Sequence, residues 1–204
     1  MKIKQQILLR KALHLSLIIP FGIFWYLSVQ TFDDYSVGQE YARWFLIAFV
    51  SLFLIYEYIR LDTKLWVPFA KLVKPKETET SVDGFNLVLA SIVSIYIFSP
   101  PIAIVAILIA IIGDTFSTIG GIYGTMRVFP KTENKTTWEG IFLALLVNFF
   151  IAASILGFSL FPLILAIVGV IIETYATKLD DNLAIPLGVG LVGEIIIRFI
   201  IPLI

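Results

Sequence analysis

The sequence predicts an all-α, polytopic helical membrane protein with about seven transmembrane helices. Hydrophobic residues make up 59% of the 204 residues and only 15% are charged, whereas a soluble domain carries about 25% charged residues. Apolar runs close to 20 residues long recur along the chain, and this length crosses about 30 Å of hydrocarbon. We therefore expect a single integral-membrane domain over residues 1–204, with the bilayer as a partner.

Seven apolar runs predict the helices, and prolines and glycines separate them. Pro100 and Pro101 divide the third run from the fourth, because proline cannot continue a helix and restrains the residue before it. Gly157 and Pro162 mark a turn between the fifth run and the sixth. The first run resembles a signal peptide but continues to Val29 without a small-residue cleavage site, so we expect a spanning helix. The predicted helices cover residues 8–29, 42–61, 83–99, 101–123, 139–157, 159–178 and 184–203.

The basic residues predict the orientation of the chain in the membrane. All basic residues except Arg43 and Arg198 fall on one predicted side of the membrane. Arg198 follows Glu194 by four residues, which predicts a structural ion pair within the last helix. By the positive-inside rule, the N-terminus and the loops after the second, fourth and sixth helices are cytoplasmic. The basic residues on this side are Lys2, Lys4, Arg10, Lys11, Arg60, Lys64, Lys71, Lys74, Lys76, Arg127, Lys131, Lys135 and Lys178.

Most acidic residues also lie at or near the predicted cytoplasmic helix ends, and Asp114 of the fourth helix is among them. An external loop is expected to hold Asp33, Asp34 and Glu40 in water. The polar clusters should therefore meet at one face, which is typical of an interfacial active site. The acids on that face are Glu57, Asp62, Glu77, Glu79, Asp83, Asp114, Glu133, Glu139, Glu173, Asp180 and Asp181.

The composition also excludes several chemistries. The chain has no cysteine, which excludes disulfides, thiolate zinc sites and cysteine nucleophiles. Its formal net charge of zero carries no sign of nucleic-acid binding, so we expect no nucleic-acid partner. The oligomeric state is left open.

The first polar cluster is Arg10, Lys11 and His14, at the start of the first helix. Residues three and four apart share one face of a helix. The cluster has two interpretations: a positive-inside anchor with a snorkelling histidine, or a patch that faces phosphate or acts in acid–base catalysis.

The second cluster is the segment from Gly113 to Gly124, in which Asp114 directly follows a long apolar run. A carboxylate close to the bilayer interior is by default a functional-site hypothesis. Gly120 and Gly124 match a small-xxx-small helix-packing pattern, and this alternative explains the glycines without explaining Asp114. Asp114 could bind Mg²⁺ together with substrate phosphates, and Lys135, with Lys131, could neutralise a polyphosphate.

The third cluster opens the fifth helix at Thr136, Thr137, Trp138, Glu139 and Gly140. Thr136 as N-cap, with Glu139 three residues later, predicts a capping box. The free amide groups of a helix N-terminus also bind anions. The two interpretations are compatible.

The fourth cluster contains Glu173 and, further along, Asp180, Asp181 and Asn182. One such residue suffices to cap the seventh helix. Because three occur together, we favour a metal-binding or catalytic role over a cap alone. Glu173 adds an intramembrane acid to this cluster.

Together these clusters resemble the dolichol kinase, phytol kinase and CTP-dependent diacylglycerol kinase family of membrane lipid kinases. The family's marks occur in the same order: Arg-Lys-x-x-His, Gly-Asp-x-x-Ala-x-x-x-Gly, Lys-Lys-Thr-x-Glu-Gly or Lys-Ser-x-Glu-Gly, and a late Glu followed by Asp-Asp-Asn and Pro-Leu. Ser117 replaces the alanine, Thr125 a further glycine, and Lys135 the lysine pair. The matching residues are Arg10, Lys11, His14, Gly113, Asp114, Gly121, Lys135, Thr137, Glu139, Gly140, Glu173, Asp180, Asp181, Asn182, Pro186 and Leu187.

The resemblance implies phosphoryl transfer from a nucleoside triphosphate, CTP in this family, to the hydroxyl of a polyprenol-, dolichol- or diacylglycerol-like lipid alcohol. It implies Asp114 and Asp181 as Mg²⁺ ligands, with Asp180 close by. One acid of the Asp180/Asp181 pair, or His14, would take the hydroxyl proton. The residues expected to contact nucleotide or phosphate are Arg10, Lys11, Gly120, Gly121, Lys135, Thr137, Glu139 and Asn182.

Two alternative functions remain open at this point. The glycine-aspartate segment is also similar to that of CDP-diacylglycerol synthases, which implies a cytidylyltransferase that forms a CDP-lipid and releases pyrophosphate. A small membrane transporter is the second alternative. It is disfavoured because the acids gather on one side and the chain shows no internal repeat.

Overall fold

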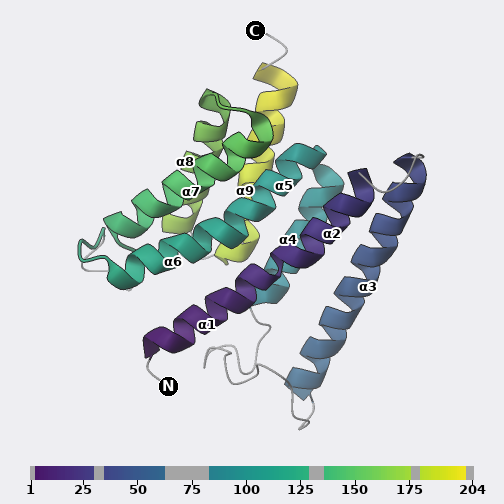
Figure 1. Cartoon of the computed structure of the whole chain (residues 1–204), viewed down its shortest axis with the longest axis horizontal. Helices are drawn as coiled ribbons and strands as arrows, with labels where there is room; N and C mark the ends of the chain where they lie inside the picture. Colours follow the sequence, from purple (N-terminus) through teal and green to yellow (C-terminus); the bar gives the residue numbers. More distant parts are fainter. Residues whose placement is uncertain (1–2, 30–34, 63–82, 129–135, 176–179, 201–204) are drawn as a thin grey trace. The chain divides into compact units, whose positions relative to one another are not determined.

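The computed structural model describes residues 3–29, 35–62, 83–128, 136–175 and 180–200, and helices account for nearly all of them (Figure 1). These residues form no strand, and one isolated β-bridge joins Arg127 and Thr137. The prediction of an all-α chain is confirmed. By internal contacts the chain divides into two compact units, Met1–Phe85 and Asn86–Ile204, and each is described by itself.

The N-terminal unit contains α1 (Ile3–Ser16), α2 (Ile18–Val29) and α3 (Tyr35–Asp62). The predicted first helix is thus two helices with a break at Leu17. Pro20 explains the break, because a proline has no N–H to donate to the carbonyl four residues before it, here that of Ser16. At the break, the Leu17 N–H donates to the carbonyl of His14, three residues earlier, at 3.1 Å. This spacing makes a tighter turn than the four-residue spacing of an α-helix.

Aromatic side chains pack α2 against α3. Phe21 is buried, and its ring meets that of Phe49 edge-on at a centroid distance of 6.4 Å. Phe53 and Tyr56 continue the ring contacts along α3. α3 begins at Tyr35, earlier than the predicted residue 42, so Glu40 is in a helix and the prediction that it lies in a loop is wrong. Asp33 and Asp34 lie outside the described residues.

The C-terminal unit contains most of α4 (Asp83–Ile97) and the remaining helices. These are α5 (Pro100–Leu108), a π-helical turn η3 (Ile109–Gly113), α6 (Asp114–Tyr123), α7 (Trp138–Leu156), α8 (Leu160–Tyr175), α9 (Asp181–Ile195) and a second π-helical turn η4 (Ile196–Ile200). Elements α5, η3 and α6 follow one another without a gap, as the predicted helix 101–123 requires.

The predicted helix breaks are confirmed in this unit. Pro100 and Pro101 occupy the first turn of α5, where a missing N–H removes no helical hydrogen bond. Gly157 ends α7 with a φ of +82°, a conformation that glycine adopts without strain. α8 then begins at Leu160 and packs antiparallel to α7.

Three helical segments are long and apolar enough to cross a membrane, judged by length and composition among the described residues. They are Pro100–Tyr123, Trp138–Leu156 and Asp181–Phe199. Gly84–Ile97 and Leu160–Tyr175 are shorter apolar helices. These lengths are compatible with the expected integral membrane protein.

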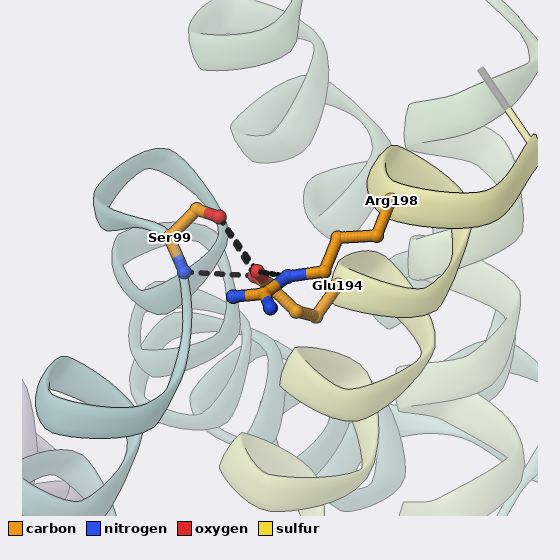
Figure 2. Close-up of polar contacts among 3 residues, drawn as sticks. All are labelled: Ser99, Glu194 and Arg198. Carbon is orange, nitrogen blue, oxygen red and sulfur yellow. Dashed lines mark hydrogen bonds and ion pairs between the residues drawn. The ribbon is translucent and has the colours of Figure 1, made fainter. Parts of the chain in front are cut away.

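A polar contact fastens the start of α5 to the last turns of α9 (Figure 2). The Glu194 carboxylate accepts hydrogen bonds from the backbone N–H of Ser99 at 2.8 Å and from its hydroxyl at 2.8 and 2.9 Å. Arg198 Nε lies 2.6 Å from the same carboxylate, which confirms the predicted ion pair. Since Glu194 is only 8% exposed, these partners compensate the desolvation of its charge.

Candidate active site

Asp114 is buried in the middle of a continuous helical segment. It is the first residue of α6, directly after the π-helical turn, and is 8% exposed. Tyr123 follows it by nine positions, which corresponds to about 14 Å along a helix axis. Asp114 therefore lies well inside the predicted helix 101–123, because Thr115 to Tyr123 continue the helix beyond it. π-helical turns within α-helices occur frequently at functional sites.

α6 and α7 touch backbone to backbone through two glycines. A Cβ placed on Gly120 would lie 2.6 Å from Cα of Gly140, and one on Gly140 would lie 2.8 Å from the carbonyl oxygen of Ser117. No other residue fits at these two positions without moving the helices apart. The helix-packing interpretation therefore accounts for Gly120, while a phosphate contact by its half-exposed neighbour Gly121 stays a prediction.

Thr137, not Thr136, is the N-cap of α7. The Thr137 hydroxyl accepts a hydrogen bond from the backbone N–H of Gly140 at 3.1 Å. The predicted capping box at Thr136 is wrong, because the Thr136 carbonyl accepts from the N–H of Val128 and the chain turns helical only after Thr137. Thr137 is buried, so its hydroxyl serves the helix terminus.

Glu139 holds the chain segment that leaves α6. Its Oε1 atom accepts from the backbone N–H of Thr125 at 2.8 Å, from the Thr125 hydroxyl at 3.2 Å and from the N–H of Met126 at 3.3 Å. The backbone N–H of Trp138 donates to the Met126 carbonyl at 2.9 Å. The glycine motif and the Thr-x-Glu-Gly motif thus form one compact junction, defined here as the α6–α7 junction (Gly120–Arg127 and Thr136–Gly140).

An apolar groove opens beside this junction. It has a volume of about 570 Å³. Tyr123 and Trp138 border it and are well exposed, at 69% and 55%, and such amphipathic aromatic residues are enriched where membrane meets water. The groove, called the α6–α7 groove below, is lined by Ile119, Gly120, Tyr123, Gly124, Met126, Trp138, Glu139, Phe142 and Leu143.

The Asp-Asp-Asn motif forms the start of α9. Asp180 is the N-cap, and its Oδ1 atom accepts from the backbone N–H of Asn182 at 2.9 Å. Its Oδ2 atom accepts from Nδ2 of Asn86 at 3.0 Å, which connects α9 to α4. Asp181 Oδ1 also accepts from the N–H of Asn182, at 3.0 Å. The cap interpretation accounts for Asp180, and α9 begins at Asp181, three residues before the predicted 184.

Asn182 and Pro186 add a polar group to this helix start. Asn182 is buried, and Pro186 lies four residues later inside α9. Proline has no N–H to donate to the carbonyl four residues before it. The Asn182 carbonyl therefore lacks its usual helical donor and is suited to accept a hydrogen bond from another group.

Two amide side chains, those of Asn86 and Asn148, were not among the predicted site residues. Asn148 is 1% exposed in α7, and neither of its amide atoms has a hydrogen-bond partner in the described part of the chain. Both residues lie within otherwise apolar runs, and a polar side chain in such a run was the available signal.

The remaining predicted site residues lie elsewhere. Arg10, Lys11 and His14 belong to α1 in the N-terminal unit. Because α1 begins at Ile3, they occupy its middle and last turn and not its start. Lys131 and Lys135 lie outside the described residues. Glu173 lies two residues before the end of α8 and is half-buried.

The described residues fit a metal ion only when a substrate supplies further ligands. Among them, no three His, Asp or Glu side chains gather closely enough to hold a metal. Mg²⁺ commonly binds through one or two carboxylates, several waters and substrate phosphates. Asp114 or Asp181 fits that role, whereas an all-protein metal cage does not fit these residues.

Comparisons of the chain with protein-family models, curated proteins and solved structures find no match. The functional interpretation therefore depends on the motifs and on the geometry of the chain itself.

Proposed function

We propose that this chain is a membrane-embedded lipid kinase. It transfers the terminal phosphoryl group of a nucleoside triphosphate, CTP by the family resemblance, to the hydroxyl of a polyprenol- or diacylglycerol-like alcohol. In this proposal seven helical segments cross the bilayer: α1–α2, α3, α4, α5–α6, α7, α8 and α9. The N-terminus and the site face the cytoplasm, which the distribution of basic residues supports.

The observation that carries the proposal is the arrangement of three motifs in the C-terminal unit. The α6–α7 junction joins the end of α6 to the start of α7. α7 and α8 are antiparallel neighbours, so the end of α8 and the start of α9 lie toward the same end as the junction. The glycine, Thr-x-Glu-Gly and Asp-Asp-Asn motifs are far apart in sequence, and their direction toward one side of this unit supports a common site for a lipid and a polyphosphate.

The reaction needs positioning and neutralisation of charge more than covalent catalysis. The alcohol oxygen attacks the terminal phosphorus, the bond from that phosphorus to the bridging oxygen breaks, and the nucleoside diphosphate leaves with the electron pair. The hydroxyl proton passes to a carboxylate of the Asp180/Asp181 pair or to His14.

Charge on the phosphates is balanced by cations of the chain and by Mg²⁺. Lys135, Arg10 and Lys11 are the basic residues assigned to this task. Asp114 and Asp181 would hold Mg²⁺, which supplies Lewis-acid neutralisation of the phosphate oxygens when bound. The freed Asn182 carbonyl is a further polar group at the start of α9.

The lipid tail lies in the α6–α7 groove in this proposal. The groove is lined mainly by apolar side chains, and Glu139 is the one charged residue in its lining, so a hydrocarbon chain would occupy the apolar part with its polar head toward Glu139. Apolar lining of this kind selects weakly among tails of similar width. The precise alcohol is therefore a question for the assay.

The test is a kinase assay on the purified full chain in lipid nanodiscs. γ-Labelled CTP and ATP are each offered with dolichol, a shorter prenyl alcohol and diacylglycerol, and the expected products are a labelled lipid phosphate and a nucleoside diphosphate. A parallel reaction offers α-labelled CTP with phosphatidic acid or a prenyl phosphate, and a labelled CDP-lipid with release of unlabelled pyrophosphate would instead establish the cytidylyltransferase. Turnover with none of these substrates would refute both enzymes.

Asp114→Asn is the matched variant for this assay. It preserves size and removes the charge, and we expect kcat to fall on the order of a thousandfold, since about 4 kcal/mol of transition-state stabilisation is lost. Near-normal activity would contradict the role of Asp114 as a metal ligand.

A further inference from the structure

Asn148 is the one polar residue on the small-residue face of α7. The face consists of buried residues spaced four apart along the helix: Gly140, Ala144, Asn148 and Ala152. Small residues on such a face let neighbouring helices approach closely. An asparagine there is exceptional, because its amide brings two donors and an acceptor into an apolar contact.

Two glycines make room for this amide. A Cβ on Gly113 would lie 2.2 Å from Oδ1 of Asn148, and a Cβ on Gly169 of α8 would lie 3.4 Å from its Nδ2. The Gly169 Cβ would also meet Ile109, at the start of the π-helical turn, at 2.7 Å. The Asn148 amide is therefore held between η3 on one side and α8 on the other.

The contact with Gly113 is directly linked to Asp114. Gly113 is the last residue of η3, and Asp114 is the next residue of the chain. Asn148 lies ten residues after Trp138, about 15 Å along α7, and Asp114 lies about 14 Å before Tyr123 along α6. Since Trp138 and Tyr123 both belong to the α6–α7 junction, Asn148 and Asp114 lie at similar depth.

The missing hydrogen-bond partners make a purely structural role a poor explanation. A buried amide without partners destabilises a fold, and an apolar side chain of similar size avoids that loss. A π-helical turn departs from the usual hydrogen-bond pattern of a helix. An amide packed directly against Gly113 restricts how the turn can rotate, and a side chain of another shape changes that restriction.

We propose that Asn148 is a positioning residue for Asp114, which acts through Gly113 to set the rotation of the π-helical turn and thus the direction of the Asp114 carboxylate. This inference rests on the proposed function, in which Asp114 holds Mg²⁺ on the nucleotide. It adds a residue of α7 that touches neither metal nor substrate.

The test is a double-mutant cycle of Gly113→Ala and Asn148→Ala in nanodiscs. The added methyl group of Gly113→Ala has no space beside the amide, so activity should fall at least about tenfold. Asn148→Ala removes the obstructing amide and should restore part of the thermal stability in the double variant, because residues in contact are not additive. Gly22→Ala is the matched control, since nothing lies within 4 Å of a Cβ there.

The readout specific to positioning is the Mg²⁺ concentration that gives half-maximal activity. Asn148→Ala and the similarly sized Asn148→Leu should raise this concentration about tenfold, while Asn148→Leu melts at or above the wild-type temperature. The control Ser154→Ala, on the exposed side of the same helix, should change neither value. If Asn148→Ala does not fold, Asn148→Leu carries the test.

The two proposals fail in different ways. A wild-type chain that phosphorylates no lipid alcohol refutes the proposed function and this inference with it, even if Gly113 and Asn148 couple in thermal stability. An active wild type whose Mg²⁺ dependence is unchanged in both Asn148 variants refutes the positioning role alone.

Discussion

Gly120→Ala distinguishes a glycine needed for packing from one that only contacts phosphate. In this variant the new Cβ would lie 2.6 Å from Gly140 Cα, 2.9 Å from Gly140 N and 3.0 Å from the Glu139 carbonyl oxygen. Carbon atoms in contact normally lie about 3.5–4.0 Å apart. All three obstructing atoms belong to the backbone, so α6 and α7 must separate by about 1 Å.

The expected loss of stability follows from that displacement. Overpacking of a well-packed interior costs about 1–3 kcal/mol, against which alanine regains about 1 kcal/mol of helix propensity over glycine. Because backbone atoms cannot give way as a side chain can, the cost should lie in the upper part of that range, about 2–3 kcal/mol, and we expect Gly120→Ala to lower the free energy of unfolding by about 1–2 kcal/mol. Gly22→Ala, with open space around the added methyl group, should be neutral or stabilising by up to about 1 kcal/mol.

The assay is unfolding in detergent followed by far-UV circular dichroism, with wild type and both variants measured in parallel. Ligand-free protein is used, so that loss of a phosphate contact cannot affect the result. Stability of Gly120→Ala equal to or above wild type would refute the backbone contact between α6 and α7 and return Gly120 to the phosphate-binding hypothesis.

Three further predictions use the same unfolding measurement. Thr137→Ala should cost about 1 kcal/mol through loss of the α7 N-cap, whereas Thr136→Ala should stay within about 0.5 kcal/mol of wild type, and the reverse order would restore the capping box at Thr136. Glu194→Ala should cost about 2 kcal/mol because the hydrogen bonds from Ser99 and Arg198 go to a charged acceptor; an unchanged midpoint would show that this contact contributes nothing. Asn86→Ala should cost about 1 kcal/mol by removing the bond to Asp180, while Ser154→Ala serves as its neutral control, and equal stability of the two variants would contradict the α4–α9 connection.

Local patterns were sufficient to locate the helices. Apolar runs and helix-breaking residues act within a few neighbours, so the breaks at Pro100–Pro101 and at Gly157 agree with the structure. The ion pair of Glu194 with Arg198 was also predictable, because residues four apart on a helix always share a face. Helix starts were less well predicted: polar residues such as Glu40 can continue a helix, and sequence alone does not show where the first turn forms.

Contacts between helices were not predictable in the same way. Asn86 meets Asp180, and Asn148 meets Gly113, across large separations in sequence. Such pairs depend on which faces of two helices meet and at what height, and an apolar run carries little information on either. The same applies to the π-helical turn before Asp114, which is an irregularity of backbone hydrogen bonding within a uniformly apolar segment.

The sequence by itself determined that this is a helical, apolar chain whose polar motifs recur at helix ends, because composition and periodicity are local properties. Only the tertiary structure decided what those motifs do within the fold. It assigned Gly120 to a helix contact, Thr137 and Asp180 to helix caps, and Glu139 to the loop after α6. It also placed Asp114 directly after a π-helical turn. Hydrogen bonds and close contacts act over a few ångströms, so their partners exist only once the helices have packed.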